Sequence, residues 1–425
     1  MTVAIFLIIL LTSVAIGIPI AFALLLCSLG LMLHLDMVDP QIMAQSIING
    51  ADNFTLLAIP FFVFAGEIMN VGGLAKRLID LPMKLVGHKA GGLGFVVIIA
   101  AVIMASLSGS PAADTAAIAA IMFPMMTKAK YDGPRSAGLI AAGGIIAPII
   151  PPSIPFIVIG VTASVSISEL FMAGIFPGLL MGVSLCIIWY FQSRKLETNQ
   201  KATGKEIFDA FKSSILALLL PIIVIGGFRL GIFTPTEAGA VASVYALFIS
   251  ICVYRELTLK AIYNALLSTA ITTAVIMLMV SAAQVSAWLM TVADLPLMVA
   301  ELLKPLASSP TLLMALILVV LLMMGMVLDL IPIVLILVPV LLPIIREAGI
   351  NEIYFCVMFI FCCSIGLITP PVGNVLNVVS GVTRVPFERA VLGVLPYAGV
   401  LILLMILMLL FPSIIIGPME FFVGK

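Results

Sequence analysis

The chain has 425 residues, of which 63% are hydrophobic and 9% charged, and its mean hydropathy is +1.33. Soluble domains average about 45–50% apolar and about 25% charged residues, so this composition excludes a water-soluble globule. The formal net charge is zero, which gives no basic surface for nucleic acid. The six cysteines lie inside apolar runs, which argues against a secreted disulfide scaffold.

The apolar runs are long enough to cross a lipid bilayer, which requires about 20 residues per helix. Backbone amides in hydrocarbon must be satisfied internally, so we expect an all-α polytopic membrane protein. The first run continues to about Leu33 without a basic start, which is typical of a retained span rather than a cleaved signal peptide. The candidate membrane segments are 2–33, 52–75, 92–127, 135–165, 169–192, 213–233, 236–254, 261–290, 311–345, 353–383 and 388–416.

The distribution of Lys and Arg predicts the orientation. The polar stretch 194–212 carries five basic residues, and the positive-inside rule places it in the cytoplasm. When the candidate segments are threaded through the membrane from this stretch toward both ends of the chain, 16 of the 20 basic residues fall on the cytoplasmic side. This count requires that 92–127 and 311–345 each enter and leave the membrane on one face. Both segments are therefore predicted to be re-entrant hairpins. The charged segment 294–307 is expected at an interface, and 34–56 is expected to face the periplasm.

The two halves of the chain share residues in the same order at a nearly constant offset. The threading gives the halves opposite orientations, and inverted repeats with broken helices are typical of secondary transporters. An old duplication with only a structural role is the alternative. The matching pairs, 214 to 219 positions apart, are Asp80/Asp294, Asp114/Asp329, Pro124/Pro339, Pro151/Pro370, Glu169/Glu388, Gly174/Gly393 and Pro177/Pro396.

This pattern predicts a division into a scaffold and two repeats. The expected parts are an N-terminal span with an interfacial segment (1–56), repeat 1 (57–192) with hairpin 92–127 and broken helix 135–165, a cytoplasmic loop (193–212), scaffold spans (213–260), repeat 2 (261–416) with hairpin 311–345 and broken helix 353–383, and a C-terminal tail (417–425).

The hairpin tips carry helix-start signals. Gly109 permits a sharp bend, and Ser110 followed by Pro111 is a good N-cap with a good first helical residue. The returning helix then points its N-terminus into the membrane, where it can attract an anion. Asp114 and Asp329 are expected in the first turns of the two returning helices. An acid there either complements the helix dipole or takes part in function.

The segment after each hairpin is broken by a pair of prolines, Pro151-Pro152 and Pro370-Pro371. Prolines free upstream carbonyls, which need partners at membrane depth. A hard cation such as Na⁺ prefers oxygen ligands, so two Na⁺ sites are predicted, each between a hairpin tip and a break. A kink satisfied by neighbouring groups is the alternative. The expected Na⁺-binding residues are Ser106, Ser108, Gly109, Asp114, Gly144, Ile146, Pro148, Pro151, Gly325, Asp329, Gly366, Thr369 and Pro370.

The hairpin tips and the breaks carry no Lys or Arg. A carboxylate substrate would therefore be held by helix N-termini, hydroxyls, amides and Na⁺. Hydrogen bonding between helices is the alternative role for these polar residues. The candidate substrate donors are Ser110, Ser153, Thr162, Asn374, Asn377 and Ser380.

Four motifs resemble the large membrane subunit of tripartite ATP-independent periplasmic (TRAP) transporters. They are Ser108-Gly109-Ser110 with Ala113-Asp114-Thr115, the stretch 143–153, Thr234-Pro235-Thr236-Glu237-Ala238, and the stretch 366–373. The resemblance implies Na⁺-driven uptake of organic acids across the bacterial inner membrane, by an elevator-type fold with a scaffold and a mobile domain. It also implies a small four-helix membrane subunit and a periplasmic substrate-binding protein as partners. The chain looks like a large subunit without a fused small one.

The stretch 366–384 looks more like sialic-acid members than dicarboxylate members, so N-acetylneuraminate is the expected substrate. One departure is Leu330, where many members carry an acid or amide. A C4-dicarboxylate or other carboxylate permease is the alternative. Two other classes also remain open: a stand-alone ion-coupled carrier that needs no binding protein, and an intramembrane enzyme using Asp114 and Asp329 as an acid pair. The expectation is a secondary transporter and not an enzyme.

Overall fold

The computed structural model describes residues 2–194, 201–303 and 309–423, and the regular secondary structure in these ranges is entirely helical. This confirms the all-α prediction. Within the same ranges, seven helices are long and apolar enough to cross a membrane. They are 54–71, Ile167–Ser193, Gly204–Arg229, 235–253, Leu259–Val292, Leu330–Glu347 and Phe387–Leu410.

The helices follow one another with short connections. In chain order they are α1 (Thr2–Ile16), α2 (Ile20–His34), α3 (Pro40–Ala51), η1 (Phe54–Leu57), α4 (Ala58–Val71), α5 (Leu74–Val86), α6 (Gly92–Ser108), α7 (Pro111–Lys128), α8 (Gly133–Gly144), α9 (Ile154–Ala163), α10 (Ile167–Ser193), α11 (Gly204–Arg229), α12 (Pro235–Phe248), η2 (Ile249–Val253), α13 (Leu259–Val292), α14 (Leu295–Leu303), α15 (Pro310–Gly325), α16 (Leu330–Glu347), α17 (Glu352–Gly366), α18 (Asn374–Thr383), α19 (Phe387–Leu410) and α20 (Ser413–Val423).

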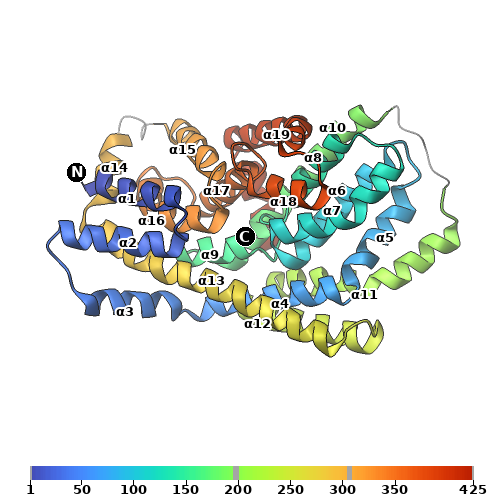
Figure 1. The fold of residues 1–425 in the computed structure, drawn as a ribbon, viewed down its shortest axis with the longest axis horizontal. Helices are drawn as coiled ribbons and strands as arrows, with labels where there is room; N and C mark the ends of the chain where they lie inside the picture. The colour runs from blue at the N-terminus through green and yellow to red at the C-terminus, as the bar shows by residue number, and fades with distance from the viewer. Residues whose placement is uncertain (1, 195–200, 304–308, 424–425) are drawn as a thin grey trace.

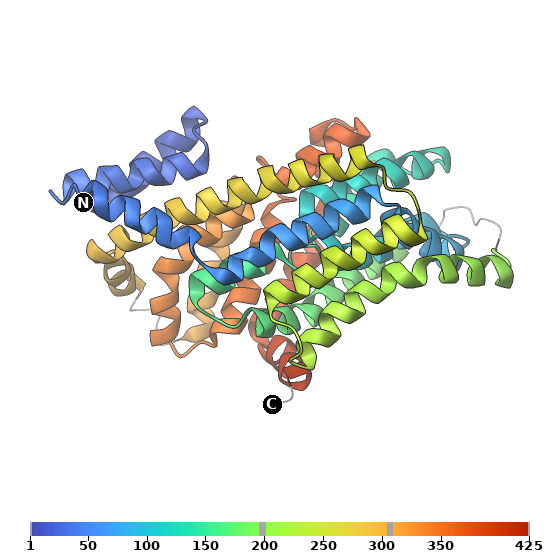
Figure 2. The same cartoon turned by 90° about the horizontal axis from the view of Figure 1, so that it is seen from below.

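One layer of the molecule is built on α13, a helix of 34 residues. Helices α2, α3 and α4 pack along it, α12 packs on α4, and α11 packs on α12 (Figures 1 and 2). Small and hydroxyl residues allow close approach in a membrane. Gly50 of α3 lies against the Ser281 backbone of α13, and the Ser243 hydroxyl of α12 donates to the Phe61 carbonyl of α4 at 2.7 Å. We refer to α4, α11, α12 and α13 as the long-helix layer.

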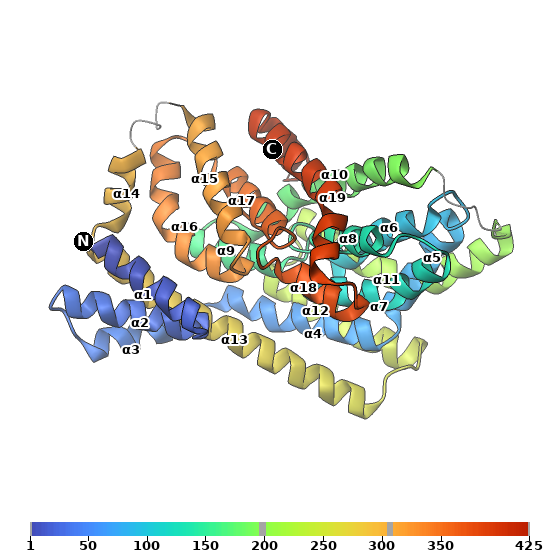
Figure 3. The same cartoon turned by 45° about the horizontal axis from the view of Figure 1, so that its top comes forward.

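Two further sets of helices lie beside this layer, and each repeats the same order. Hairpin α6–α7 is followed by the broken pair α8 and α9 and by the long helix α10. Hairpin α15–α16 is followed by the broken pair α17 and α18 and by the long helix α19. Figure 3 shows α9, α17 and α18 in the middle of the molecule, between the two hairpins. Both predicted hairpins and both predicted breaks are therefore confirmed.

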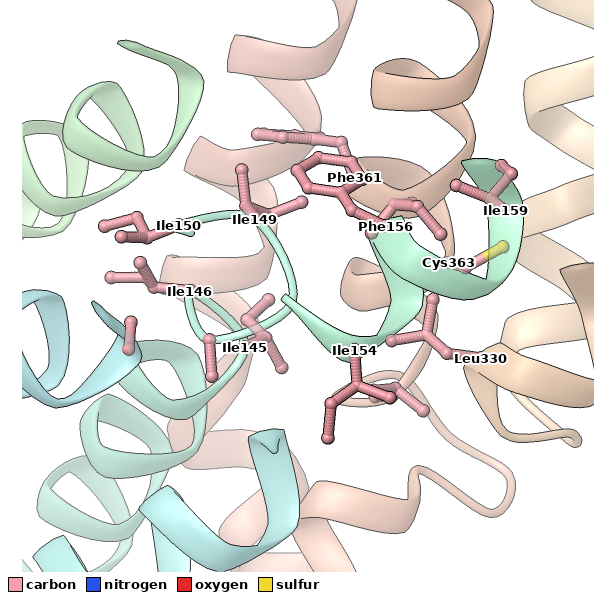
Figure 4. Packing of buried hydrophobic residues seen from close by; sticks show 14 of the residues in the cluster. Ile145, Ile146, Ile149, Ile150, Ile154, Phe156, Ile159, Leu330, Phe361 and Cys363 are labelled. Atoms are coloured by element: carbon pink, nitrogen blue, oxygen red, sulfur yellow. The ribbon is translucent and has the colours of Figure 1, made fainter. Parts of the chain in front are cut away.

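The breaks occur at the paired prolines. The chain is unwound over 145–153 and 367–373, and the Pro151-Pro152 and Pro370-Pro371 peptide bonds are both cis. Proline lacks the N–H that would continue a helix. Figure 4 shows the first unwound segment curving between its two helical pieces, with the side chains of Ile145, Ile146, Ile149 and Ile150 around it. All four are buried, so apolar contacts hold the irregular backbone inside the protein.

Three segments differ from their sequence-based predictions. The expected first span divides into α1 and α2, because Gly17 adopts a φ of +86° and Pro19 follows two residues later. The expected loop 193–212 contains the start of α11, where Thr203 and Glu206 form a capping box. The expected tail 417–425 is largely the end of α20, which packs on α10. Residues 195–200 of the predicted loop, 304–307 of the predicted interfacial segment and 424–425 of the predicted tail lie outside the described ranges.

Candidate functional site

A cavity of about 410 Å³ lies between the two hairpin tips and the long-helix layer. Its volume falls within the usual range of about 300–1,000 Å³ for small-molecule sites. The residues that line it are Val63, Gly66, Glu67, Asn70, Ser108, Gly109, Ser110, Pro111, Ala112, Ala113, Ile154, Pro155, Ile271, Thr272, Val275, Ile276, Met279, Asp329, Leu330, Ile331 and Asn374.

The cavity lies level with the middle of α13. The α13 residues that line it run from Ile271 to Met279, at the centre of Leu259–Val292. Ser110 and Asp329 at the two hairpin tips line the same cavity. Both tips therefore reach the middle of the longest helix, which is the position expected of re-entrant hairpins that meet inside the membrane.

Four helices begin at this cavity. Its lining includes the first residues of α7, α9, α16 and α18, represented by Pro111, Ile154, Leu330 and Asn374. A helix N-terminus carries about half a positive charge and presents unpaired N–H groups, so it attracts anions. The lining residues include no Lys or Arg. The positive ends of the helix dipoles are therefore the groups in this lining that can attract a carboxylate, beside the acids Glu67 and Asp329.

The tip of the first hairpin contains buried polar atoms without partners. The Ser108 hydroxyl donates to Asp114 Oδ1 at 2.5 Å. Asp114 Oδ2 and the Thr115 hydroxyl are buried and have no hydrogen-bond partner within the described residues. The Thr115 hydroxyl lies against Gly144 of α8. Buried polar atoms without partners are rare in native proteins, and a bound cation is one way to satisfy oxygen atoms.

The first break packs directly on this tip. Gly109 has a φ of +61°, and a Cβ there would lie 2.6 Å from the Pro152 carbonyl oxygen. Within the break, the Gly144 and Ile146 carbonyls accept hydrogen bonds from nearby backbone N–H groups at 2.9 to 3.2 Å. The Gly144 carbonyl accepts one bond and keeps a second lone pair, whereas the Ile146 carbonyl accepts two, from Ile149 and Ile150 N–H. The tip and the break are therefore in contact, as predicted. Some of the carbonyl oxygens of the break are already occupied by backbone hydrogen bonds.

Four further predicted residues of the first repeat take part in local hydrogen bonds: Ser106, Ser110, Pro148 and Ser153. The Ser153 hydroxyl donates to the Pro148 carbonyl at 2.5 Å and accepts from Phe156 N–H at 3.2 Å, so it caps α9. Ser106 donates to the Ile103 carbonyl at 2.6 Å. Ser110 caps α7 by accepting from Ala113 N–H at 3.4 Å, and Ser110 itself lines the cavity.

The second hairpin packs on the second break through glycine. A Cβ at Gly366 would lie 2.6 Å from the Gly325 Cα, so the two backbones are in contact. The Val372 and Gly373 N–H groups donate to the Met326 carbonyl at 3.1 and 3.2 Å. The Thr369 hydroxyl donates to the Ile365 carbonyl at 2.8 Å. The tip and break of this repeat are joined by main-chain contacts.

Asp329 occupies a different position from the one predicted. It is the N-cap of α16, and its Oδ1 accepts from Leu330 N–H at 2.9 Å, so it precedes the first helical turn. Asp114 lies within the first turn of α7, as expected. The Asn374 side chain faces the Asp329 carboxylate, and both line the cavity. The structure thus brings residues of the second tip and second break together.

Four predicted substrate donors lie outside the cavity lining: Ser153, which caps α9, and Thr162, Asn377 and Ser380. The Thr162 hydroxyl donates to the Val158 carbonyl, the Asn377 amide donates to the Val372 carbonyl, and the Ser380 hydroxyl donates to the Val385 carbonyl. Each bond is local, at 2.7 to 2.9 Å. The structure does not bring these side chains to the cavity that holds Ser110 and Asn374.

The cavity also contains polar residues that the sequence analysis missed. Glu67 and Asn70 project from α4, and Thr272 projects from α13. Ser268 of α13 donates to Glu67 Oε1 at 2.6 Å, which joins the two helices at the cavity wall. An acid within an otherwise apolar helix was the available signal for Glu67.

Comparisons with known proteins agree on the class. The family model described as the tripartite ATP-independent periplasmic transporter, DctM component, matches residues 7–414. The chain is 60% identical over 422 residues to the 2,3-diketo-L-gulonate TRAP transporter large permease of Escherichia coli, covering 99% of both chains. It is 39% identical over 410 residues to the sialic acid TRAP transporter large permease of Vibrio cholerae, covering 96% of both.

A solved structure supports the fold. The Alcanivorax borkumensis YdaH transporter, described as having an unusual topology, aligns with a TM-score of 0.65 at 15% identity, covering 89% of this chain and 88% of that one. Together with the all-helical architecture, the two hairpins and the two breaks, these matches identify the family of the chain. The chain belongs to the DctM family of TRAP transporter large permeases, multi-pass proteins of the bacterial inner membrane.

Proposed function

We propose that this chain is the permease subunit of a Na⁺-coupled importer that takes up an organic acid. The observation that carries the proposal is the convergence of four helix N-termini on one cavity that no Lys or Arg lines. Such a site favours an anion. It contains no Lys or Arg, so no unpaired cationic side chain is left buried, at a cost in free energy, when the substrate is absent.

The coupling ion is proposed to bind at the two contacts between tip and break. In the first repeat, Asp114 Oδ2 and the Thr115 hydroxyl are buried oxygens without partners among the described residues, and the Thr115 hydroxyl lies against Gly144. In the second, Asp329 and the Gly325–Gly366 contact supply the corresponding groups. Na⁺ at these positions would satisfy the oxygens and add positive charge beside the anion site. Anion and cation would then each favour the binding of the other.

The proposed substrate is a sugar-derived monocarboxylic acid, with 2,3-diketo-L-gulonate as the first candidate. The relative named for that acid is 60% identical, whereas the relative named for sialic acid is 39% identical. The expectation of N-acetylneuraminate therefore has less support than the alternative of another carboxylate. It rested on the stretch 366–384, in which Asn374 lines the cavity while Asn377 and Ser380 do not.

An elevator-type movement is proposed to carry the cavity across the membrane. The hairpins and broken helices would move as a unit against the long-helix layer. The cavity lies at the boundary between the two. Gly66 of α4 packs closely on Ser108 there, because a Cβ at Gly66 would lie 3.1 Å from the Ser108 Cα. Family membership supports two partners for the working assembly, a small membrane subunit and a periplasmic binding protein.

Transport by the reconstituted assembly tests the proposal. The chain, its small subunit and its binding protein are placed in proteoliposomes, and radiolabelled organic acid is followed with Na⁺, K⁺ or no cation gradient. Accumulation only with an inward Na⁺ gradient is expected. Uptake of equal extent in K⁺ would contradict the coupling, and full uptake without the binding protein would indicate a stand-alone carrier.

A further inference from the structure

We infer that Glu67 makes the cavity selective for acids with one carboxylate and a hydroxyl-bearing tail, and that it rejects dicarboxylates of the same length. This inference rests on the proposed function of the cavity. Glu67 makes the wall opposite the helix N-termini negative. The charge of that wall determines which group is tolerated at the end of the bound acid that is remote from its carboxylate.

The cavity has two chemically different sides. Helices α7, α9, α16 and α18 present their N-termini on one side. Helices α4 and α13 form the other side and contribute Glu67, Asn70 and Thr272. A carboxylate satisfies the first side. The second side offers hydrogen-bond acceptors and a neutral amide, which suit hydroxyl groups.

Glu67 faces the cavity with one oxygen available. Its Oε1 accepts from the Ser268 hydroxyl at 2.6 Å, which orients the side chain. Its Oε2 has no hydrogen-bond partner in the part of the chain that the structure describes, and the residue is only half-buried because it opens into the cavity. An ionised carboxylate accepts hydrogen bonds and donates none, so Oε2 can receive a substrate hydroxyl but not a second carboxylate.

Asp329 is the other carboxylate among the cavity-lining residues, but its surroundings differ. It caps the N-terminus of α16 and accepts from Leu330 N–H at 2.9 Å, so the helix dipole offsets its charge. Glu67 lies toward the C-terminal end of α4, which begins at Ala58 and ends at Val71, so the helix dipole does not compensate its charge. A negative end group beside Glu67 would meet uncompensated repulsion in a site partly shielded from water.

A matched pair of probes isolates this effect. L-gulonate and D-glucarate have the same carbon chain and hydroxyl configuration, and they differ by a terminal CH₂OH in place of a second carboxylate. Binding of each is measured by calorimetry to the chain with its small subunit in nanodiscs at saturating Na⁺, without the binding protein. The unmodified chain should bind L-gulonate about ten- to hundredfold more tightly, the range expected for one partly shielded like-charge contact.

Substitutions at Glu67 separate charge from shape. Glu67→Gln keeps the size and the acceptor for Ser268 and should bring the two affinities within about threefold of each other, mainly by improving D-glucarate binding. Glu67→Asp keeps the charge and should retain the preference. Asn70→Asp adds a negative charge to the same wall and should widen the preference, so the inference stays testable if Glu67→Gln fails to fold. Glu388→Gln, an exposed change outside the cavity, is the control.

The outcomes are distinct from those of the proposed function. An unchanged preference in Glu67→Gln, together with no effect of Asn70→Asp, would overturn the inference while leaving Na⁺-driven uptake intact. Equal binding of both acids by the unmodified chain, or binding of neither, would also overturn it. Absence of Na⁺-driven uptake of any organic acid by the full assembly would instead contradict the proposed function.

Discussion

The Ser108 hydroxyl donates to Asp114 Oδ1 at 2.5 Å and so closes the tip of the first hairpin across the start of α7. The bond orients a buried carboxylate whose other oxygen has no partner within the described residues. The bond fixes the orientation of the carboxyl group, so the remaining oxygen is presented in a defined direction.

Ser108→Ala should weaken Na⁺ binding without abolishing it. The change removes the bond that orients Asp114 but leaves the carboxylate in place. We expect the Na⁺ concentration for half-maximal uptake to rise about three- to tenfold, the effect of losing about 1 kcal/mol of ordering. Na⁺ titration of uptake in proteoliposomes measures it. An unchanged Na⁺ dependence in Ser108→Ala would remove Asp114 from the proposed site.

Thr115→Val distinguishes an ion ligand from a hydroxyl that is merely buried. The Thr115 hydroxyl lies against Gly144 and has no hydrogen-bond partner in the described ranges. If it binds Na⁺, the isosteric Val should raise the half-saturating Na⁺ concentration about tenfold and reduce the thermal stabilisation that Na⁺ provides. If the hydroxyl is only buried, Val should raise the melting temperature and leave the Na⁺ dependence unchanged.

Gly366→Ala should destabilise the second half of the protein. A Cβ at this position would lie 2.6 Å from the backbone of Gly325, and neither main chain can move away without separating the hairpin from the break. We expect a loss of about 1–3 kcal/mol, seen as a lower melting temperature of the purified protein. Gly399→Ala is the matched control, because a Cβ there meets nothing within 4 Å. Equal melting temperatures for the two variants would contradict the packing.

Ser153→Ala and Asn374→Ala should have different effects, although both residues were predicted substrate donors. Ser153 is fully buried and caps α9, so its removal should lower stability by about 1 kcal/mol and leave the KM for substrate unchanged. Asn374 lines the cavity, so its removal should raise KM by about fivefold with little change in melting temperature. Transport kinetics and thermal unfolding of both variants measure the difference. The reverse pattern would show that the cavity is not the substrate site.

The sequence carries much of the information about the framework, because the responsible signals are local. Pro151-Pro152 and Pro370-Pro371 identify the breaks, and Ser110-Pro111 identifies the start of α7. The length of the apolar runs predicts most spans. It does not separate α1 from α2, because the turn at Gly17 lies between apolar residues and leaves the run uninterrupted. Charge suggests a loop before Lys212, whereas the capping box at Thr203 starts α11 earlier.

The site is less predictable because it depends on contacts between distant segments. The pairing of Glu67 with Ser268 joins residues 201 positions apart, and no local pattern announces it. Hydroxyls and amides look alike in sequence whether they cap a helix or face a cavity. Ser153, Asn377 and Ser380 therefore entered the predicted substrate set, but the structure shows their side chains in local hydrogen bonds.

Calorimetric binding of the organic acid to the large and small subunits, carried out in Na⁺ and again in choline, tests the central claim most directly. The claim is that cations at the hairpin tips complete an anion site formed by four helix N-termini. Binding with a saturable heat in Na⁺ and at least about tenfold weaker binding in choline is the predicted result. Equal affinity in the two salts would contradict it.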